Sequence, residues 1–366
     1  MKGMEISMKK ILHITECLGS GVLNYIKNIT AWQVAEYEVY VAYAIRPETP
    51  ENFKEQFDKR VCFIYIEGFT REIDPYNDLK AFRNIKKIVK AIHPDLIHLH
   101  STKAGIIGRW AVSCKKYKVF YSPHAYSFLM MNCSKRKRNI YQMIEKISDR
   151  KRCLTIADSN GEYEASKLVA QNAVCIPNGI NPFEMDCMIE MAKTLIEKHD
   201  SMAICTLGKV VHQKNPRLFN EIAGQFPECK FIWIGAGPLE NVLTSPNIVI
   251  TGWLTREQAI ARIMNSDMFL FTSLWESLSI ALMEVMYLGK PCIVSKCDGN
   301  RDVIKDGING FLCDNIDEYV EAINKLLHSS QLRDEFGTQA KRDIVEIYNV
   351  EQIERRYRNL FEEIGI

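Results

Sequence analysis

The feature that most constrains the fold is an alternation of short apolar segments with segments of helical periodicity, which restarts part-way along the chain. Predicted strands before the restart lie at 10–15, 38–45, 61–66, 95–100, 119–122, 154–157 and 174–176. A turn at 177–179 breaks the pattern, and further strands are predicted at 203–207, 230–234, 248–250, 268–271 and 292–295. Such alternation predicts parallel sheets with helices on both faces. We therefore expect an α/β protein of two Rossmann-like, doubly wound domains that face one another across a cleft, with ligands beyond the carboxyl ends of the strands.

Length and composition agree with two globular domains. The 366 residues exceed one ordinary core, and 47% hydrophobic with 25% charged residues is typical of soluble proteins. We expect a first domain over 1–180, a linker over 181–200 and a second domain over 201–345. No apolar run is long enough for a membrane-spanning helix, and the N-terminus lacks the pattern of a signal peptide. The 12 cysteines occur singly, which favours reduced thiols in a cytoplasmic protein.

Two glutamates eight residues apart are the most informative pair for chemistry. Glu276 follows the predicted strand 268–271, and Glu284 lies in a helix expected to begin near Ser279. A helix N-terminus offers unpaired N–H groups to a phosphate, and ionised carboxylates accept hydrogen bonds from sugar hydroxyls. The pair suits a ligand with both groups, although the same spacing also occurs on ordinary solvated helices.

Four more loops at predicted strand ends carry candidate ligand-binding residues. The Gly19-Ser20-Gly21 turn could bring backbone amides close to a phosphate. Lys209 and Lys214 follow the first strand of the second half, where they suit a diphosphate leaving group. His124 ends another strand and faces the expected cleft. Gly235-Ala236-Gly237 would let a nucleotide lie against the backbone. Each pattern alone is also compatible with a plain turn or a solvated surface.

Charge is distributed unevenly along the chain. Residues 1–180 carry 28 Lys and Arg against 18 Asp and Glu, whereas residues 181–366 carry 19 against 27. The basic excess is greatest at Lys135, Arg136, Lys137 and Arg138, just after the apolar segment Phe128–Met131. Apolar residues beside a basic cluster suit an anionic membrane surface or a phosphate-bearing acceptor, and a solvated basic helix is the alternative. The chain contains no nucleic-acid-binding signature.

Taken together, these residues resemble the retaining glycosyltransferases of family 4, which have the GT-B fold. The resemblance extends from Ile11 to about Tyr357. Its most specific parts are the segments His98–Arg109, Ile176–Ile180 and Gly208–Asn215 and the pair Glu276 and Glu284. The resemblance also implies that the last segment, 346–366, is a helix that crosses back onto the first domain.

The resemblance assigns a role to each candidate. Glu276 and His124 would lie at the reacting sugar, and Glu284 would bind the ribose hydroxyls. Lys209 and Lys214 would neutralise the diphosphate, and Lys103 with the basic cluster would lie on the acceptor side. Phosphate oxygens would be bound by the Gly19–Gly21 loop and by backbone amides of Ser277, Leu278, Ser279 and Ile280.

The reaction implied is transfer of a hexose-type sugar, with retention, from a nucleotide diphosphate sugar, UDP rather than GDP. The acceptor would be a polyprenyl-diphosphate-linked saccharide in O-antigen, capsule or exopolysaccharide assembly. The enzyme would be peripheral on the inner face of the cell membrane. No Asp-x-Asp ends a predicted strand, so we expect neither a metal nor a cofactor besides the donor substrate.

Three departures from the family pattern concern the same sites. Ser20 stands where the family often has glycine, and Lys209 stands where it usually has arginine, which loses a bidentate fork. Ser277-Leu278 replaces a frequent Gly-Phe beside the donor sugar. Two alternatives remain: a nucleotide-sugar 2-epimerase of the same architecture, and a non-catalytic nucleotide-sugar-binding protein. A dehydrogenase is disfavoured because no G-x-G-x-x-G opens the first helix.

Overall fold

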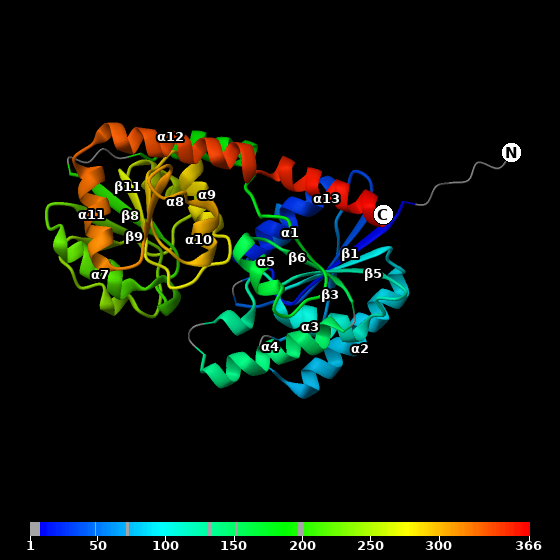
Figure 1. The fold of residues 1–366 in the computed structure, drawn as a ribbon. Coiled ribbons are helices and arrows are strands. Elements are labelled where there is room, and N and C mark those ends of the chain that lie inside the picture. The colour runs from blue at the N-terminus through cyan, green and yellow to red at the C-terminus, as the bar shows by residue number, and fades with distance from the viewer. Residues whose placement is uncertain (1–7, 48, 71–72, 131–132, 151, 197–200) are drawn as a thin grey trace. The chain divides into compact units, whose positions relative to one another are not determined.

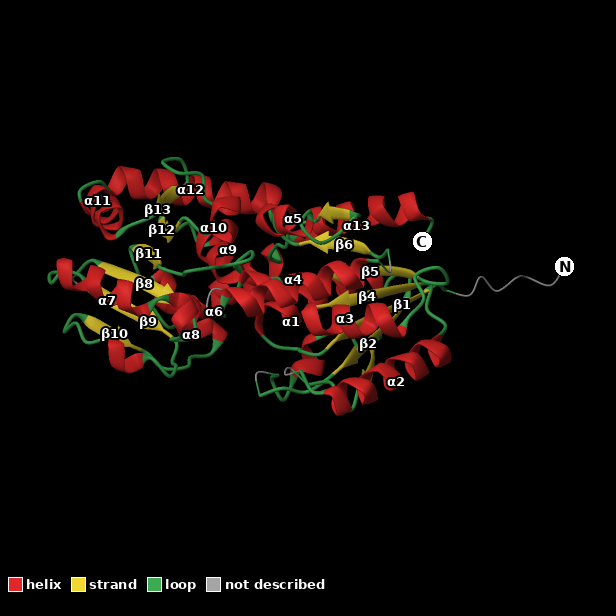
Figure 2. Cartoon of the chain, turned by 60° about the horizontal axis from the view of Figure 1, so that its bottom comes forward, coloured by secondary structure: helices red, strands yellow, loops and turns green. Residues whose placement is uncertain are grey.

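The chain divides into two compact units. The computed structural model describes residues 8–366 except 48, 71–72, 131–132, 151 and 197–200. Unit 1 contains the residues up to Pro177 together with Ile353–Ile366, and unit 2 is Asn178–Gln352. Each unit has its own parallel sheet with flanking helices (Figures 1 and 2), which confirms the predicted α/β class with two Rossmann-like domains.

Unit 1 is built on a seven-stranded parallel sheet in the order β3-β2-β1-β4-β5-β6-β7. Its strands are β1 (Lys10–Thr15), β2 (Glu38–Tyr43), β3 (Cys62–Tyr65), β4 (Leu96–His100), β5 (Lys118–Ser122), β6 (Leu154–Ala157) and β7 (Ala173–Cys175). The central strands β1 and β4 are buried on both faces except at Lys10, as is typical of parallel strands that helices cover.

Helices cover both faces of the unit 1 sheet. They are α1 (Ser20–Gln33), α2 (Pro75–Ile92), α3 (Thr102–Ala111), α4 (Lys135–Asp149), α5 (Asn160–Ser166) and α13 (Val350–Ile364), with short 3-10 turns at Phe53–Gln56 and Ser127–Leu129. Side chains of α1 and α13 form one core with Ile11 and Phe120 of the sheet. Those of α2 and α3 form a second core with Leu12 and Leu99.

Unit 2 has a six-stranded parallel sheet in the order β10-β9-β8-β11-β12-β13. Its strands are β8 (Ala203–Leu207), β9 (Lys230–Ile234), β10 (Ile248–Ile250), β11 (Met268–Phe271), β12 (Cys292–Ser295) and β13 (Gly310–Cys313). Its helices are α6 (Pro182–Lys193), α7 (Pro216–Gln225), α8 (Arg256–Met264), α9 (Ile280–Tyr287), α10 (Asp298–Val303), α11 (Ile316–Leu327) and α12 (Ser330–Ile347), with 3-10 turns at His212–Lys214 and Glu240–Val242. Two cores, one on each face, again enclose the sheet.

The segment expected as a linker is instead largely helical. Within 181–200, α6 begins at Pro182, whose fixed φ suits a first helical position. Asn181 caps the helix by accepting a hydrogen bond from Glu184 N. Met185 and Ala192 are fully buried in a core of unit 2. Most of the described part of this segment is therefore a helix of unit 2, whose apolar residues Met185 and Ala192 pack on that core.

The C-terminal region consists of two helices. Helix α12 ends at Ile347 and α13 begins at Val350, so the expected segment 346–366 begins inside α12. Ile353, Tyr357, Leu360 and Phe361 of α13 are buried in the core of unit 1. The hydroxyl of Tyr357 also shares a short hydrogen bond with that of Tyr25 on α1. The chain therefore returns to unit 1 after completing unit 2.

Candidate active site

Two adjacent loops at the carboxyl edge of the unit 2 sheet bring an acidic and a basic residue together. Strands β8 and β11 are neighbours in the sheet, and the loops that follow them carry Lys214 and Glu276. The hydroxyl of Thr272 donates to Lys214 O at 2.8 Å, and Leu274 N donates to Gln213 O at 2.8 Å. These bonds fix one loop on the other, so the positions of the two charged residues depend on each other.

Lys214 and Glu276 form a partly buried ion pair. Lys214 Nζ lies 2.6 Å from Glu276 Oε1, and the two side chains are 16% and 9% exposed. The ammonium group also lies 4.2 Å from the centroid of the Phe271 ring, which stabilises a cation through the ring's negative face. An oriented carboxylate and a partly desolvated ammonium at this edge can bind sugar hydroxyls and phosphate oxygens, respectively.

Glu284 is held in a second charged cluster, which the sequence did not reveal. Arg256, the first residue of α8, donates to Glu284 Oε1 and to Glu184 Oε1, each at 2.5 Å. Burial disfavours the charged guanidinium, but the two carboxylates outweigh this effect and raise the pKa of Arg256. The contact with Arg256 orients the Glu284 carboxylate, which suits a group that binds hydroxyls.

The N-terminus of α9 lies between the two glutamates in sequence. Ser279 is the N-cap, and its hydroxyl accepts a hydrogen bond from Leu282 N. Ser277 and Leu278 precede the helix, and Leu278 is buried. Ile280 is the first helical residue. The predicted amide segment therefore consists of a loop, a cap and the first turn of a helix, as anion binding at a helix N-terminus requires.

In unit 1, the Gly19–Gly21 turn is the beginning of a helix rather than a free loop. Gly19 is the N-cap of α1, and Ser20 is its first residue. A Cβ atom at Gly21 would meet no atom within 4 Å, so the space over this first turn is open. The predicted phosphate-binding role of this turn stays a prediction.

His124 occupies a strained turn after β5. Its φ is 51°, and that of Ala125 is 80°, two consecutive left-handed residues that are not glycine. Glu162 stabilises the turn by accepting hydrogen bonds from Ala125 N at 2.7 Å and Asp158 N at 3.0 Å. Strain of this kind costs free energy and is often found at functional sites.

Both ring nitrogens of His124 have partners inside unit 1. Nδ1 lies 3.2 Å from Asp158 Oδ2, and Nε2 lies 3.1 Å from His100 Nδ1. His100 Nε2 in turn lies 3.0 Å from His13 Nδ1, and His13 Nε2 lies 2.8 Å from Gln33 Oε1. A series of hydrogen bonds thus connects α1, β1, β4 and the turn after β5 with Asp158, which follows β6.

The interior histidines are neutral at physiological pH. Burial lowers the pKa of His13 to about 4, although the hydrogen bond to Gln33 opposes the effect. Burial and neighbouring histidines also lower the pKa values of His98 and His100 well below the usual range. Each of these rings therefore carries one N–H group.

His13, His98 and His100 are also close enough together to be considered as a metal site. Their ligating nitrogens all lie within 4.8 Å of one another. His98 and His100 lie with their ring centroids 4.0 Å apart and their planes tilted by 36°, and His13 and His100 already hydrogen-bond one another. The described rings are thus packing and hydrogen-bonding partners of each other.

Two family models of known proteins match this chain, one over most of each unit. Residues 19–183 match the model described as Glycosyltransferase Family 4, and residues 188–343 match that described as Glycosyl transferases group 1. The chain belongs to the family 4-like glycosyltransferases of the GT-B fold. The predicted resemblance and fold are therefore confirmed.

Two relatives align with this glycosyltransferase over most of its length. It is 29% identical to the UDP-Gal:alpha-D-GlcNAc-diphosphoundecaprenol alpha-1,3-galactosyltransferase of Escherichia coli, covering 74% of this chain and 76% of the relative. An uncharacterized 41.2 kDa protein in the cps region of Klebsiella pneumoniae is 28% identical, covering 82% and 85%.

Two solved structures share the whole fold. Sucrose-phosphate synthase from Thermosynechococcus elongatus superimposes with a TM-score of 0.82 at 15% identity, covering 98% of this chain and 99% of that one. Anabaena HepE in complex with UDP and glucose gives a TM-score of 0.78 at 17% identity, covering 97% and 100%.

Two predicted glycines of the glycosyltransferase make room for its own backbone. A Cβ atom at Gly235 would lie 2.3 Å from Gly208 O, and one at Gly237 would lie 2.4 Å from Val210 O. These positions let the loop after β9 pack against the loop after β8. Gly299 was missed from the sequence, yet its Cβ would overlap Ser277 O at 1.3 Å. Its role is to let α10 support the loop that carries Glu276.

The predicted basic residues lie in three kinds of surroundings. Lys209 is exposed, whereas Lys103 Nζ forms an ion pair with Asp78 at 2.6 Å and is only 12% exposed. Lys135, Arg136, Lys137 and Arg138 form the first turn of α4. The helix dipole disfavours cations at this end. The dipole therefore does not stabilise these four cations, and the predicted role of the cluster stays a prediction.

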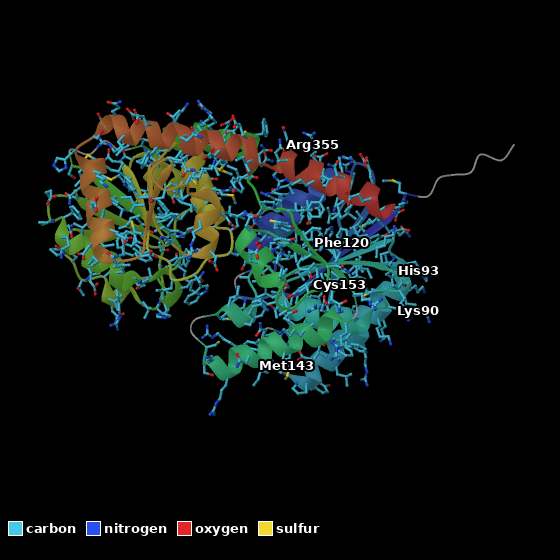
Figure 3. The ribbon with its side chains drawn as sticks, in the orientation of Figure 1. Lys90, His93, Phe120, Met143, Cys153 and Arg355 are labelled. Carbon is cyan, nitrogen blue, oxygen red and sulfur yellow. The ribbon has the colours of Figure 1, made fainter. Side chains whose placement is uncertain are left out.

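The apolar segment beside this cluster is not exposed as a whole. Phe128 is buried and stacks on Tyr126 with ring centroids 4.7 Å apart, while Leu129 is 37% exposed. Met131 lies outside the described residues. The expectation for Phe128 is wrong because the 3-10 turn directs it into the core. Instead, α4 itself exposes Ile140, Met143 and Ile147 at helical spacing, and Met143 is labelled in Figure 3.

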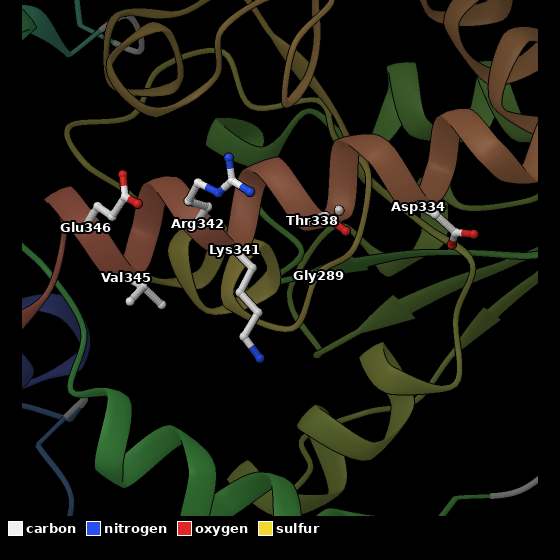
Figure 4. Close-up of a pocket in the computed structure, with 8 residues that line it drawn as sticks. Gly289, Asp334, Thr338, Lys341, Arg342, Val345 and Glu346 are labelled. Atoms are coloured by element: carbon white, nitrogen blue, oxygen red, sulfur yellow. The ribbon is translucent and has the colours of Figure 1, made fainter.

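A surface pocket of unit 2 contains none of the predicted site residues. It lies between α12 and the turn after α9 (Figure 4). The residues that line it are Gly289, Asp334, Gly337, Thr338, Lys341, Arg342, Val345 and Glu346. Its side chains on α12 are largely charged and exposed, and it offers neither a buried carboxylate nor a helix N-terminus. We therefore do not assign the sugar chemistry to it.

Proposed function

We propose that the chain is a retaining glycosyltransferase that moves a hexose-type sugar from a UDP-sugar to a polyprenyl-diphosphate-linked saccharide. The product would enter O-antigen, capsule or exopolysaccharide assembly. The observation that carries the proposal is the partly buried ion pair of Lys214 and Glu276 beside the N-terminus of α9. These groups provide a cation and helix amides for a diphosphate and a carboxylate for the sugar.

The donor class is supported from two directions. Glu284 is an oriented carboxylate suited to the two hydroxyls of a ribose. The Escherichia coli relative is named as using UDP-galactose, and HepE of the same fold was solved with UDP and glucose. A UDP-hexose is therefore the donor that we propose.

The acceptor class is supported by the same relative and by the surface of unit 1. The Escherichia coli relative is named as acting on a GlcNAc-diphosphoundecaprenol. A lipid-linked acceptor requires that the enzyme work at a membrane surface. None of the described helices is both long and apolar enough to cross a bilayer. Helix α4 instead combines a basic first turn with exposed Ile140, Met143 and Ile147, as interfacial helices do. We propose peripheral binding to the inner face of the cell membrane.

The proposed chemistry is a front-face displacement without a metal. The acceptor hydroxyl would attack on the side from which the diphosphate departs, and a diphosphate oxygen would take the proton. Lys214 and the α9 amides would stabilise the charge that develops on the leaving group. A two-carboxylate glycosidase scheme is not needed.

The test is a transfer assay with defined substrates. Purified protein would be incubated with single UDP-hexoses and GDP-hexoses and a synthetic polyprenyl-diphosphate GlcNAc, and the anomeric configuration of the product would be read by NMR. We expect one UDP-hexose to give an α-linked disaccharide, in EDTA as well as in its absence. Epimerised free sugar without acceptor, or tight donor binding without turnover, would contradict the proposal. Complete dependence on Mn²⁺ or Mg²⁺ would contradict its metal-free chemistry.

A further inference from the structure

The position of the His124 ring depends on more than the contacts of its two nitrogens. Asp158 and His100 lie at those nitrogens, and the residue itself stands in a strained left-handed turn. Tyr25 of α1 packs against the same ring, with ring centroids 4.6 Å apart and ring planes at 68°. Aromatic contacts of this edge-to-face kind are attractive and directional. Tyr25 therefore limits how far the His124 ring can tilt or shift.

Tyr25 is itself held by a residue from the other end of the chain. Its hydroxyl shares a hydrogen bond with that of Tyr357 on the C-terminal helix α13, which lies beside α1 in unit 1 (Figure 1). Tyr25 and Tyr357 are 1% and 0% exposed, so water cannot replace either partner. Burial raises the pKa values of both phenols, and both are therefore neutral. Removing one hydroxyl would leave the other buried without this partner.

The two tyrosines are packed among the interior histidines. The centroid of the Tyr25 ring lies 5.8 Å from that of His100 and 6.5 Å from that of His98. The His98 ring lies 6.1 Å from that of Tyr357. Closely packed interiors transmit displacements, because there is little free space to absorb them. A shift of Tyr25 would therefore be passed on to the His124 ring.

We propose that Tyr25 and Tyr357 are positioning residues for His124, so that the C-terminal helix fixes the ring predicted to lie at the reacting sugar. Tyr25 acts by ring contact, and Tyr357 acts through the hydroxyl of Tyr25. Neither tyrosine is assigned a contact with a substrate. The role of His124 in the reaction rests on the proposed function, whereas the placement of its ring is a property of unit 1 alone.

The first test compares kcat with KM in full-length variants. Tyr357→Phe and Tyr25→Phe each keep the aromatic ring and remove one hydroxyl of the shared bond. We expect each to lower kcat by about two- to tenfold, the factor that one ordinary hydrogen bond represents. The donor KM should change little, because Lys214, Glu276 and Glu284 lie in unit 2. This split between kcat and KM is what a displaced His124 would cause.

The double variant Tyr25→Phe/Tyr357→Phe decides whether the two hydroxyls act together. Because they share one bond, the double variant should have the kcat of either single variant and not the product of the two losses. Losses that multiply would mean that each tyrosine acts separately, and would overturn the proposed connection from α13 to His124.

Ile353→Val is the matched control for looser packing of α13. Ile353 is 3% exposed and lies in the same core, four residues before Tyr357, so its truncation weakens the docking of the helix and keeps both hydroxyls. Thermal unfolding measures the stability that each variant loses. We expect kcat to fall in Tyr357→Phe and not in the control. An unchanged kcat in Tyr357→Phe, or an equal loss in Ile353→Val, would mean that the tyrosines only fasten the helix.

NMR of the full chain separates this inference from the proposed function. In ¹³C–¹H spectra of protein labelled in its 8 histidines, the His124 ring signals are identified by their loss in His124→Gln. We expect Tyr357→Phe to move these signals, because the Tyr25 ring beside them shifts, and Ile353→Val to leave them in place. Unmoved His124 signals in Tyr357→Phe and Tyr25→Phe would overturn the proposal. If the unaltered protein transfers no sugar, the proposed function fails, and these spectra still decide whether the tyrosines position the ring.

Discussion

Lys214 and Glu276 act as a unit at the residue scale, because each is the charge partner of the other in a partly buried site. Removing one leaves the other with an uncompensated charge, which costs more than the pair contributes. The chemical and the structural effects of a substitution must therefore be separated by measuring folding and activity together. The same applies to Glu284, whose carboxylate is held by Arg256.

Glu276→Ala should reduce kcat by about a hundredfold or more, since it removes a group expected at the reacting sugar. The fold should persist, because Lys214 keeps its contact with the Phe271 ring. Rates of single-turnover transfer and a thermal unfolding curve would measure the two effects. Lys296→Met, which breaks an exposed ion pair with Asp314, is the control and should leave kcat unchanged. Near-normal turnover in Glu276→Ala would remove this residue from the donor site.

Glu284→Ala should weaken donor binding by about ten- to a hundredfold, equivalent to roughly 1.5–3 kcal/mol for a charge-assisted hydrogen bond. Arg256→Met should weaken it less, because the carboxylate remains but loses its orientation. Titration calorimetry with UDP measures both affinities. Glu190→Ala, at an exposed ion pair with Lys193, is the matched control. The ribose assignment fails if UDP binds Glu284→Ala as tightly as the unaltered protein.

At the scale of single elements, the proposed membrane binding rests on helix α4. Its basic residues occupy the end where the helix dipole opposes them, and its outer face exposes Ile140, Met143 and Ile147. Both features cost stability or solubility in water, and both become favourable at an anionic bilayer, where each basic residue contributes about 1 kcal/mol.

Replacing Lys135, Arg136, Lys137 and Arg138 by glutamine should release the protein from anionic liposomes. The matched control neutralises four exposed cations of α2, which are Arg83, Lys86, Lys87 and Lys90. It changes the net charge equally and should leave binding intact. Co-sedimentation at low and high salt measures the effect, which salt should weaken. Equal sedimentation of the two quadruple variants would mean that net charge, and not α4, controls binding.

At the scale of the whole molecule, the C-terminal helix completes unit 1 after the chain has formed unit 2. Tyr357 is fully buried, contacts the ring of Trp32 and shares a hydrogen bond with Tyr25. The stability of unit 1 therefore depends on a segment more than 300 residues away from its first strand, as the contact between Tyr25 and Tyr357 shows.

Tyr357→Ala should destabilise unit 1 by about 3–5 kcal/mol, the usual cost of truncating a buried aromatic residue, and leave unit 2 nearly unchanged. Denaturant unfolding followed by hydrogen exchange resolves the two units, because protection is lost separately in each cooperative region. Arg355→Ala on the exposed face of the same helix, labelled in Figure 3, is the control. A uniform loss of protection in both units would contradict independent docking of α13 on unit 1.

The sequence alone determined the two α/β domains, the strand ends and most of the candidate residues. Buried strands are short continuous apolar segments and helix faces recur with a period of 3.6 residues, so both can be read from the sequence without contacts. Glu276, Lys214 and His124 were predicted because they follow such strands. Their roles as donor-site residues stay predictions.

Only the tertiary structure decided which distant side chains meet. Arg256 clamps Glu284 from another helix, Gly299 makes room for the Glu276 loop, and Gln33 ends the series of hydrogen-bonded histidines. Phe128 was misjudged for the same reason, and the helix within the expected linker was not foreseen, since burial depends on what packs above a segment. Such contacts join residues with no fixed spacing in sequence. Close packing of side chains and the pairing of buried charges select them once the chain is folded.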